Sequence, residues 1–150
     1  MVIPSRDGRA LLEQLLPQIE PGLVRKVIVV DNGSGDETGG LASEFVEVLS
    51  SPEPLSFAAA VNRGIQASRT EYTCLLNNDM VLEEGFFAAL HEAFARVPAL
   101  FCATAQIFLP EGKRREETGK AVYSPQGERD FPLRCELPLE GEDLTPVLYG

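Results

Sequence analysis

Short apolar runs alternate along the chain with longer segments in which apolar residues recur at helical spacing. The runs at Val2-Ile3 and Val27–Val30 are unbroken and mostly β-branched, which is typical of strands covered on both faces in a parallel sheet. Further strands are expected over residues 45–49, 72–76 and 100–109. Helices are expected over residues 9–18, 38–44, 57–68 and 86–97. Asp7 is the expected N-cap of the first helix.

The resulting order alternates strands with helices, and the connections are too short for anything but parallel crossovers. We therefore predict an α/β fold with an open, mainly parallel, doubly wound sheet over residues 1–110. After Pro110, charged residues, proline and glycine mix with short apolar pieces. This pattern predicts an irregular extension over residues 111–150 with two short strands. The chain stops within the apolar run that begins at Val147, so we expect it to be truncated at its C-terminus.

The composition narrows the possible functions of this chain. Its 150 residues carry a formal net charge of −10, which disfavours a general grip on nucleic acid because that requires a basic surface. No apolar run reaches the roughly 18 residues of a membrane span. The N-terminus lacks a signal-peptide pattern, so we expect a cytoplasmic location. With one histidine and no clustered cysteines, any metal ion would be held by oxygen ligands.

Polar residues follow several of the expected strands, at the sheet edge where open α/β sheets bind ligands. Pro4-Ser5-Arg6 follows the first strand, Asp31–Asp36 the second, and Asn77-Asn78-Asp79 the fourth. The loop before Phe57 is a further candidate segment at this edge. Asp31 is suited to accept a hydrogen bond from a nucleobase imide, and Ser34 to hold a ribose. A nucleotide diphosphate is strongly anionic, so an acidic protein needs Mg²⁺ or Mn²⁺ to bind it. Asp79 is the candidate ligand of that cation.

Three segments follow the opening Val-Ile-Pro-Ser: VIVVDNGSGDET (27–38), FAAAVNRGIQAS (57–68) and YTCLLNNDMVL (72–82). Together they resemble the inverting family-2 glycosyltransferases of the GT-A fold. The Asn-Asn-Asp triplet looks most like the rhamnosyltransferase-like branch, and the resemblance covers about residues 1–110. It implies transfer, with inversion and metal assistance, of a sugar from a UDP-, dTDP- or GDP-linked donor. The implied acceptor is a hydroxyl of a glycan or lipid-linked molecule, as in polysaccharide biosynthesis.

The resemblance also implies roles for individual residues. The expected nucleotide-sugar-binding residues are Pro4, Ser5, Arg6, Asp31, Ser34, Asn62, Asn77, Asn78 and Asp79. Among them, Asp31 would meet the base, Asn62 would lie near the base and diphosphate, and Asp79 would bind the metal. In this family the second half of the protein supplies the acceptor site and the catalytic base. Neither Glu116-Glu117 nor Glu142-Asp143 is a convincing base, so we expect the donor-binding portion without its acceptor-binding half.

Other functions stay open on the residues alone. The chain is also consistent with a non-catalytic nucleotide-sugar-binding fragment or interaction module. A sugar nucleotidyltransferase would share the sheet but usually has a glycine-rich basic loop, which residues 5–9 resemble only faintly. A dinucleotide-binding oxidoreductase is suggested by Gly33-x-Gly35, with Glu53 about 20 residues on. Carboxylates around those glycines would repel a pyrophosphate, which disfavours that alternative.

Overall fold

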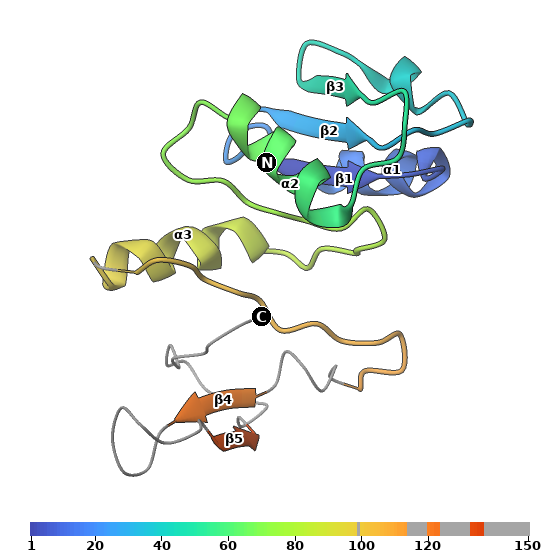
Figure 1. Cartoon of the computed structure of the whole chain (residues 1–150). Helices are drawn as coiled ribbons and strands as arrows, with labels where there is room; N and C mark the ends of the chain where they lie inside the picture. The colour runs from blue at the N-terminus through green and yellow to red at the C-terminus, as the bar shows by residue number, and fades with distance from the viewer. Residues whose placement is uncertain (99, 114–119, 124–132, 137–150) are drawn as a thin grey trace. The chain divides into compact units, whose positions relative to one another are not determined.

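A parallel sheet forms the centre of the N-terminal part of the chain, as the apolar runs predict. The computed structural model describes residues 1–98, 100–113, 120–123 and 133–136, and the chain divides into two units, Met1–Glu84 and Gly85–Gly150. The first unit carries the strands β1 (Val2–Ser5), β2 (Val27–Asp31) and β3 (Val46–Ser50), in the spatial order β1-β2-β3 (Figure 1). Its helical segments are α1 (Arg9–Leu15), η1 (Leu16–Gln18), η2 (Thr38–Leu41) and α2 (Phe57–Ala67).

The register of the sheet aligns the carboxyl ends of its strands. Ser5, the last residue of β1, pairs with Asp31, the last residue of β2, and Asp31 pairs in turn with Ser50 at the end of β3. The loops that leave these strands therefore start side by side at one edge. All residues of β2 are buried, which confirms the prediction of a strand covered on both faces.

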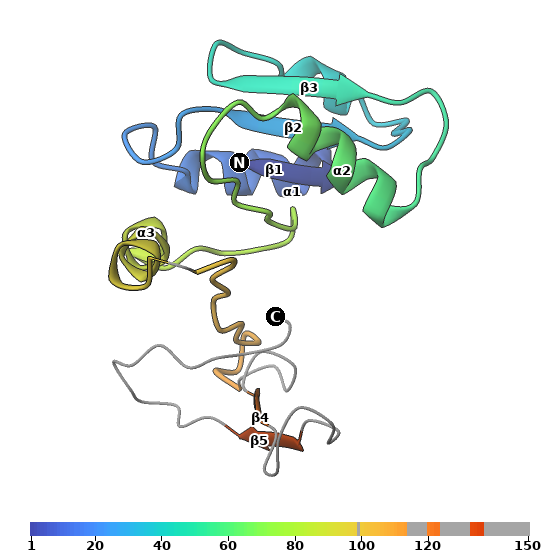
Figure 2. The same ribbon diagram turned by 60° about the vertical axis from the view of Figure 1, so that its left-hand side comes forward.

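Helices cover both faces of the sheet, so the expected doubly wound arrangement is present (Figure 2). Val2, Ile28 and Val30 form one buried cluster with Ala60 of α2. The alternate residues of β1 and β2 point to the opposite face, where α1 lies. Those residues are fully buried, as are the two leucines with which α1 contributes to the core; they are Ile3, Val27, Val29, Leu12 and Leu15.

Three expectations in the first unit need correction. The helix expected over residues 38–44 is the four-residue 3₁₀ helix η2, which ends at Leu41. The N-cap of α1 is Gly8 rather than Asp7, because Asp7 has a left-handed φ of +48° and its side chain bonds elsewhere. The segment 72–76 makes one isolated parallel bridge, from Leu75 to Val2, in place of a full strand. Two hydrogen bonds hold it, from Val2 N to the Cys74 oxygen at 2.8 Å and from Leu76 N to the Val2 oxygen at 3.0 Å.

The second unit begins with α3 (Phe86–Arg96), which confirms the predicted helix. The expected strand over 100–109 belongs to neither of the described sheets, since an apolar run becomes a strand only where a neighbouring backbone pairs with it. Farther along, β4 (Lys120–Tyr123) and β5 (Leu133–Glu136) pair antiparallel. The carboxylate pairs Glu116-Glu117 and Glu142-Asp143 lie outside the described residues. Within the part of the chain that the structure describes, no helix is both long and apolar enough to span a membrane.

Gly64 provides a test of how closely α2 packs on the sheet. A Cβ atom at Gly64 would collide with Val2 Cγ1 and lie 2.9 Å from Val30 Cγ2. We expect Gly64→Ala to lower the free energy of unfolding by about 1–3 kcal/mol, because overpacking outweighs the gain in helix propensity. Urea denaturation measures this change.

Gly22→Ala is the matched control, because nothing lies within 4 Å of a Cβ at that position. Its unfolding free energy should stay within about 0.5 kcal/mol of the parent chain. A Gly64→Ala variant at least as stable as the parent would contradict the close packing of α2 on β1 and β2.

Candidate functional site

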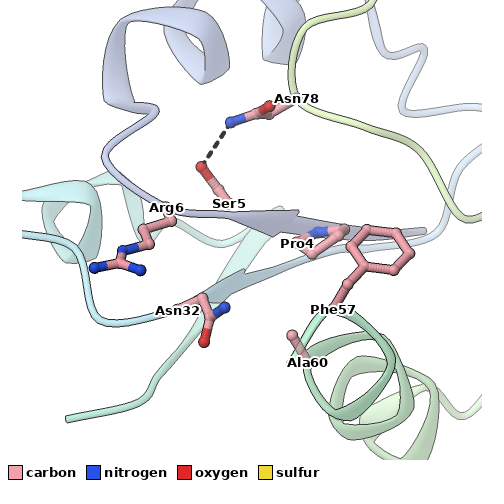
Figure 3. Close-up of a pocket in the computed structure, with 7 residues that line it drawn as sticks. All are labelled: Pro4, Ser5, Arg6, Asn32, Phe57, Ala60 and Asn78. Atoms are coloured by element: carbon pink, nitrogen blue, oxygen red, sulfur yellow. Dashed lines mark hydrogen bonds between the residues drawn. The ribbon is translucent and has the colours of Figure 1, made fainter. Parts of the chain in front are cut away.

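A cavity opens at the carboxyl edge of the sheet. Its volume is about 220 Å³, below the roughly 300 Å³ at which pockets for whole small ligands begin, so it is large enough to enclose only part of such a ligand. Segments far apart in the sequence contribute to it: the end of β1, the first residue after β2, the first turn of α2, and the loop after Leu76 (Figure 3). The lining residues are Pro4, Ser5, Arg6, Asn32, Phe57, Ala60 and Asn78.

The loop that carries Asn78 is anchored to the end of β1. Asn78 Nδ2 donates a hydrogen bond of 2.9 Å to Ser5 Oγ, and Ser5 is buried with 4% of its surface exposed (Figure 3). Gly8 leaves room for this pair, because a Cβ there would collide with Asn78 Nδ2 and lie 2.6 Å from Ser5 Oγ. This contact fixes Asn78, together with its neighbours Asn77 and Asp79, beside the carboxyl ends of β1 and β2.

Reciprocal hydrogen bonds join the loop after β1 to the loop after β2. The backbone N–H of Asp7 donates to Ser34 Oγ at 2.9 Å, and the N–H of Gly35 donates to Asp7 Oδ1 at 2.8 Å. Within the second loop, the Ser34 N–H donates to Asp31 Oδ1 at 3.0 Å. The left-handed conformation of Asp7 is thus held in place by its partners, and the two loops are hydrogen-bonded to each other beside the cavity.

Asp36 ties the same loop to the start of α1. Its carboxylate accepts hydrogen bonds from Thr38 Oγ1 at 2.6 Å and from the backbone N–H of Arg9 at 2.8 Å. These hydrogen bonds stabilise the ionised form, so they hold the pKa of Asp36 below its ordinary value, with the Thr38 hydroxyl making the largest contribution. Arg9 also donates from Nη1 to the Glu37 oxygen at 2.8 Å. The Asp36 carboxylate therefore has a structural role, since it connects the loop after β2 to the start of α1.

Asn32 fixes the position at which α2 begins. Its side-chain amide pairs with the backbone of Leu55: the Leu55 N–H donates to Asn32 Oδ1 at 2.6 Å, and Asn32 Nδ2 donates to the Leu55 oxygen at 2.9 Å. Ser56 then caps α2, since its Oγ accepts from the N–H of Ala59 at 3.3 Å. We call this arrangement the Asn32–Leu55 lock. It connects the end of β2 to the first turn of α2, where Phe57 and Ala60 line the cavity.

Of the nine residues expected at the site, Pro4, Ser5, Arg6 and Asn78 line the cavity, and the other five do not. Asp31 is buried at the end of β2, and Ser34 is hydrogen-bonded to it and to Asp7. Asn77 and Asp79 are exposed on either side of Asn78. Asn62 is exposed on α2 and is not among the residues that line the cavity.

Two lining residues, Phe57 and Ala60, were missed by the sequence analysis. Asn32 lies within the segment Asp31–Asp36 that was expected at this edge, although no role was predicted for it. The Phe57 side chain itself gave no signal, because an aromatic residue at the first position of an amphipathic helix is ordinarily a core residue. Phe57 is instead 61% exposed.

The chemistry of the loop 77–79 limits how it can hold a metal ion. Among the described residues, no group of three or more histidine, cysteine or acidic side chains is arranged to hold one. Asp79 offers one exposed carboxylate, beside the amides of Asn77 and Asn78. Mg²⁺ is commonly held by one or two carboxylates together with phosphate oxygens of the substrate and water. The donor set therefore fits a cation that the ligand helps to bind, and does not fit an all-protein cage.

Comparison with known proteins gives a consistent result. A family model described as glycosyl transferase family 2 matches residues 9–140. A pre-mycofactocin glycosyltransferase of Mycobacterium tuberculosis is 30% identical over 140 residues, which cover 89% of this chain and 29% of that protein. A Sinorhizobium fredii protein, y4gI, is 29% identical over 126 residues, or 75% of this chain and 14% of that protein. The chain thus spans less than a third of the length of these relatives.

The anchoring of the loop 77–79 can be measured with a double-mutant cycle. We expect Ser5→Ala and Asn78→Ala to show a coupling energy of about 0.5–1.5 kcal/mol in urea denaturation, because each substitution removes the same hydrogen bond. Asn77→Ala, paired with Ser5→Ala, is the control and should be additive within about 0.5 kcal/mol. Additive effects of Ser5→Ala and Asn78→Ala would show that the loop is held by something else.

The lowered pKa of Asp36 predicts a dependence of stability on pH. A carboxyl group whose pKa is lower in the folded state stabilises the fold above its unfolded pKa of about 4, and this stabilisation is lost as the pH falls through the lower folded-state pKa. We expect Asp36→Asn to be less stable than the parent at pH 7 and to lose stability less steeply below pH 4. Unfolding free energies measured between pH 2 and pH 7 test this. Parallel curves for parent and variant would contradict it.

Proposed function

The chain belongs to glycosyl transferase family 2, and on this premise we propose that its first unit binds the nucleotide-diphosphate sugar of a glycosyltransferase reaction. The family implies the GT-A fold, with which the parallel α/β sheet agrees. The sugar would pass, with inversion, to a hydroxyl group of a glycan or lipid-linked acceptor. We predict that residues 1–110 form the domain that binds the donor and that residues 111–150 form an extension of this domain.

The observation that carries this proposal is the convergence of separate loops on one cavity at the carboxyl edge of the sheet. Ser5 and Asn78 are hydrogen-bonded to each other although 73 positions separate them, and Asp7 and Ser34 although 27 positions separate them. A nucleotide has several parts, namely a base, a ribose and phosphates, and needs polar groups from several directions. A cavity too small for the whole ligand fits one of these parts and leaves the others along its rim.

Within this site we propose that Asp31 and Arg6 contact the nucleoside. Asp31 Oδ1 accepts from the Ser34 N–H, which orients the carboxylate, and Oδ2 would accept the ring N–H of a uracil, thymine or guanine base. Among the described residues that line the cavity, Arg6 alone is charged, and it would offset part of the charge of the phosphates. This proposed contact is consistent with UDP, dTDP or GDP as the carrier of the sugar.

We further propose that Asp79 binds Mg²⁺ or Mn²⁺ together with the diphosphate. The chain carries a net charge of −10, so it would repel a free polyanion. When bound, the cation would neutralise negative charge on the departing diphosphate as a Lewis acid. Asn77 and Asn78, on the same loop, would donate hydrogen bonds to the ribose or the sugar. We assign the catalytic base to none of the described residues.

The proposal predicts that Asp79 is needed for binding that depends on the metal. We expect Asp79→Ala to abolish the Mn²⁺-dependent component of nucleoside diphosphate binding while leaving the melting temperature of the free chain unchanged, because Asp79 is exposed. Calorimetric titration of UDP, dTDP and GDP, with and without Mn²⁺, measures this. Glu83→Ala removes a second exposed carboxylate nearby in the sequence and should have no effect.

Equal affinity of parent and Asp79→Ala chains in the presence of Mn²⁺ would remove Asp79 from the site. The same titrations with nucleotide sugars, followed by assays for hydrolysis and transfer, separate two functions of the chain. Binding together with turnover supports a glycosyltransferase. Binding without turnover supports the alternative of a unit that binds the nucleotide sugar and does not transfer it.

A further inference from the structure

Phe57 exposes an aromatic ring at the cavity, where packing of the core does not explain it. Phe57 is 61% exposed, although Ala60 and Val61 of the same helix are buried. Phe57 is the only aromatic residue among those that line the cavity. In Figure 3 its ring rises from the first turn of α2 beside Pro4. An exposed aromatic ring at the edge of a cavity is favourable when a ligand covers it.

The position of the ring is fixed by the residues that precede it. Leu55 is hydrogen-bonded at both its N–H and its oxygen in the Asn32–Leu55 lock, and it packs against the buried cluster of Val2, Ile28, Val30 and Ala60. Ser56 caps the helix, so Phe57 starts it at a defined angle. The N–H of Ala60 bonds to the Ser56 oxygen at 3.0 Å, which closes the first turn. The ring is therefore carried by a rigid backbone.

The cavity has two chemically different sides. Pro4, Phe57 and Ala60 provide an apolar wall, whereas Ser5, Arg6, Asn32 and Asn78 provide polar groups. Of the parts of a nucleotide sugar, only the base combines a flat apolar face with a polar edge. The phosphates have no apolar face, and the C–H faces of the ribose and the sugar are puckered, so these parts would cover less of the Phe57 ring than a planar base does.

From this geometry we infer that Phe57 is the stacking platform for the nucleobase of the donor, and that the Asn32–Leu55 lock positions it. The inference rests on the proposed function of the site as a donor site. The ring would cover one face of the base, while polar groups at the ends of β1 and β2 bind its edge. Stacking on an aromatic ring tolerates any base, so Phe57 would contribute affinity and leave the choice of base to the polar groups.

The chain contains no tryptophan, so a single tryptophan placed at residue 57 reports directly on stacking. We expect the fluorescence of Phe57→Trp to be quenched when UDP, dTDP or GDP is added with Mg²⁺, and to stay unchanged with inorganic pyrophosphate, which has no base. Ile65→Trp is the matched control, because Ile65 is also exposed on α2, at 44%, and does not line the cavity. Its fluorescence should not respond to any of these ligands.

Affinities measured by calorimetry complete the test. Phe57→Ala should weaken binding of the nucleoside diphosphate by about five- to 150-fold, while the affinity for pyrophosphate stays the same. Phe57→Tyr keeps a ring and should bind like the parent chain. Phe57→Leu, which keeps an apolar side chain of similar size, should be weakened nearly as much as Phe57→Ala and serves if the alanine variant does not fold.

The outcomes separate the two proposals. If the parent chain binds no nucleoside diphosphate, the proposed function fails and the stacking platform fails with it. If the parent binds one and both Phe57→Ala and Phe57→Leu bind it equally well, the donor site stands and the platform is wrong. Equal weakening of nucleoside diphosphate and pyrophosphate in these variants would also overturn it, because the ring would then act through the shape of the site and not through the base.

Discussion

The alignment of Ser5, Asp31 and Ser50 across the ends of the three strands is the constraint on which the candidate site depends. A parallel sheet in this register places the first loop residues of β1 and β2 next to each other, so Asn32 N–H bonds to the Ser5 oxygen at 2.8 Å and Ser51 N–H to the Asp31 oxygen at 2.8 Å. Side chains then extend this backbone network outward. A shift of one residue between β1 and β2 would turn Ser5 and Asp31 away from their present partners.

Electrostatics imposes a second constraint, because the protein is acidic and its proposed ligand is a polyanion. Three carboxylates at the end of β2 and in the loops after β1 and β2 already accept hydrogen bonds: Asp31 and Asp7 accept backbone N–H groups, and Asp36 accepts a hydroxyl and an N–H. These hydrogen bonds stabilise the negative charge of the carboxylates and hold the loops together. Arg6 in the cavity and a cation on Asp79 would supply the positive charge that the phosphates require. The affinity for the nucleotide should therefore depend on the metal ion.

The strands and most helices of the first unit were predictable from the sequence, because β-branched runs and helical spacing are local patterns. The general position of the site was also predictable, since ligands bind at the carboxyl edge of such sheets. The Asn32–Leu55 lock was not, because it joins residues 23 positions apart through a side-chain amide that has no sequence signature. The same holds for Phe57, whose exposure depends on how the lock starts α2. The segment 72–76 has the composition of a strand, and we therefore predicted a full one. Composition does not determine over how many residues a segment pairs with its neighbour.

The most direct test of the convergence of these loops on one ligand is a two-dimensional NMR titration of backbone amides with a nucleoside diphosphate and Mg²⁺. We predict that the amides of residues 5–8, 31–35, 55–60 and 77–79 shift together, with one dissociation constant. The amides of η1 and of residues 20–26, which lie in the segment before the amino end of β2, should stay unchanged. Shifts confined to one of these loops, or located mainly outside them, would contradict a single site at the carboxyl edge of the sheet.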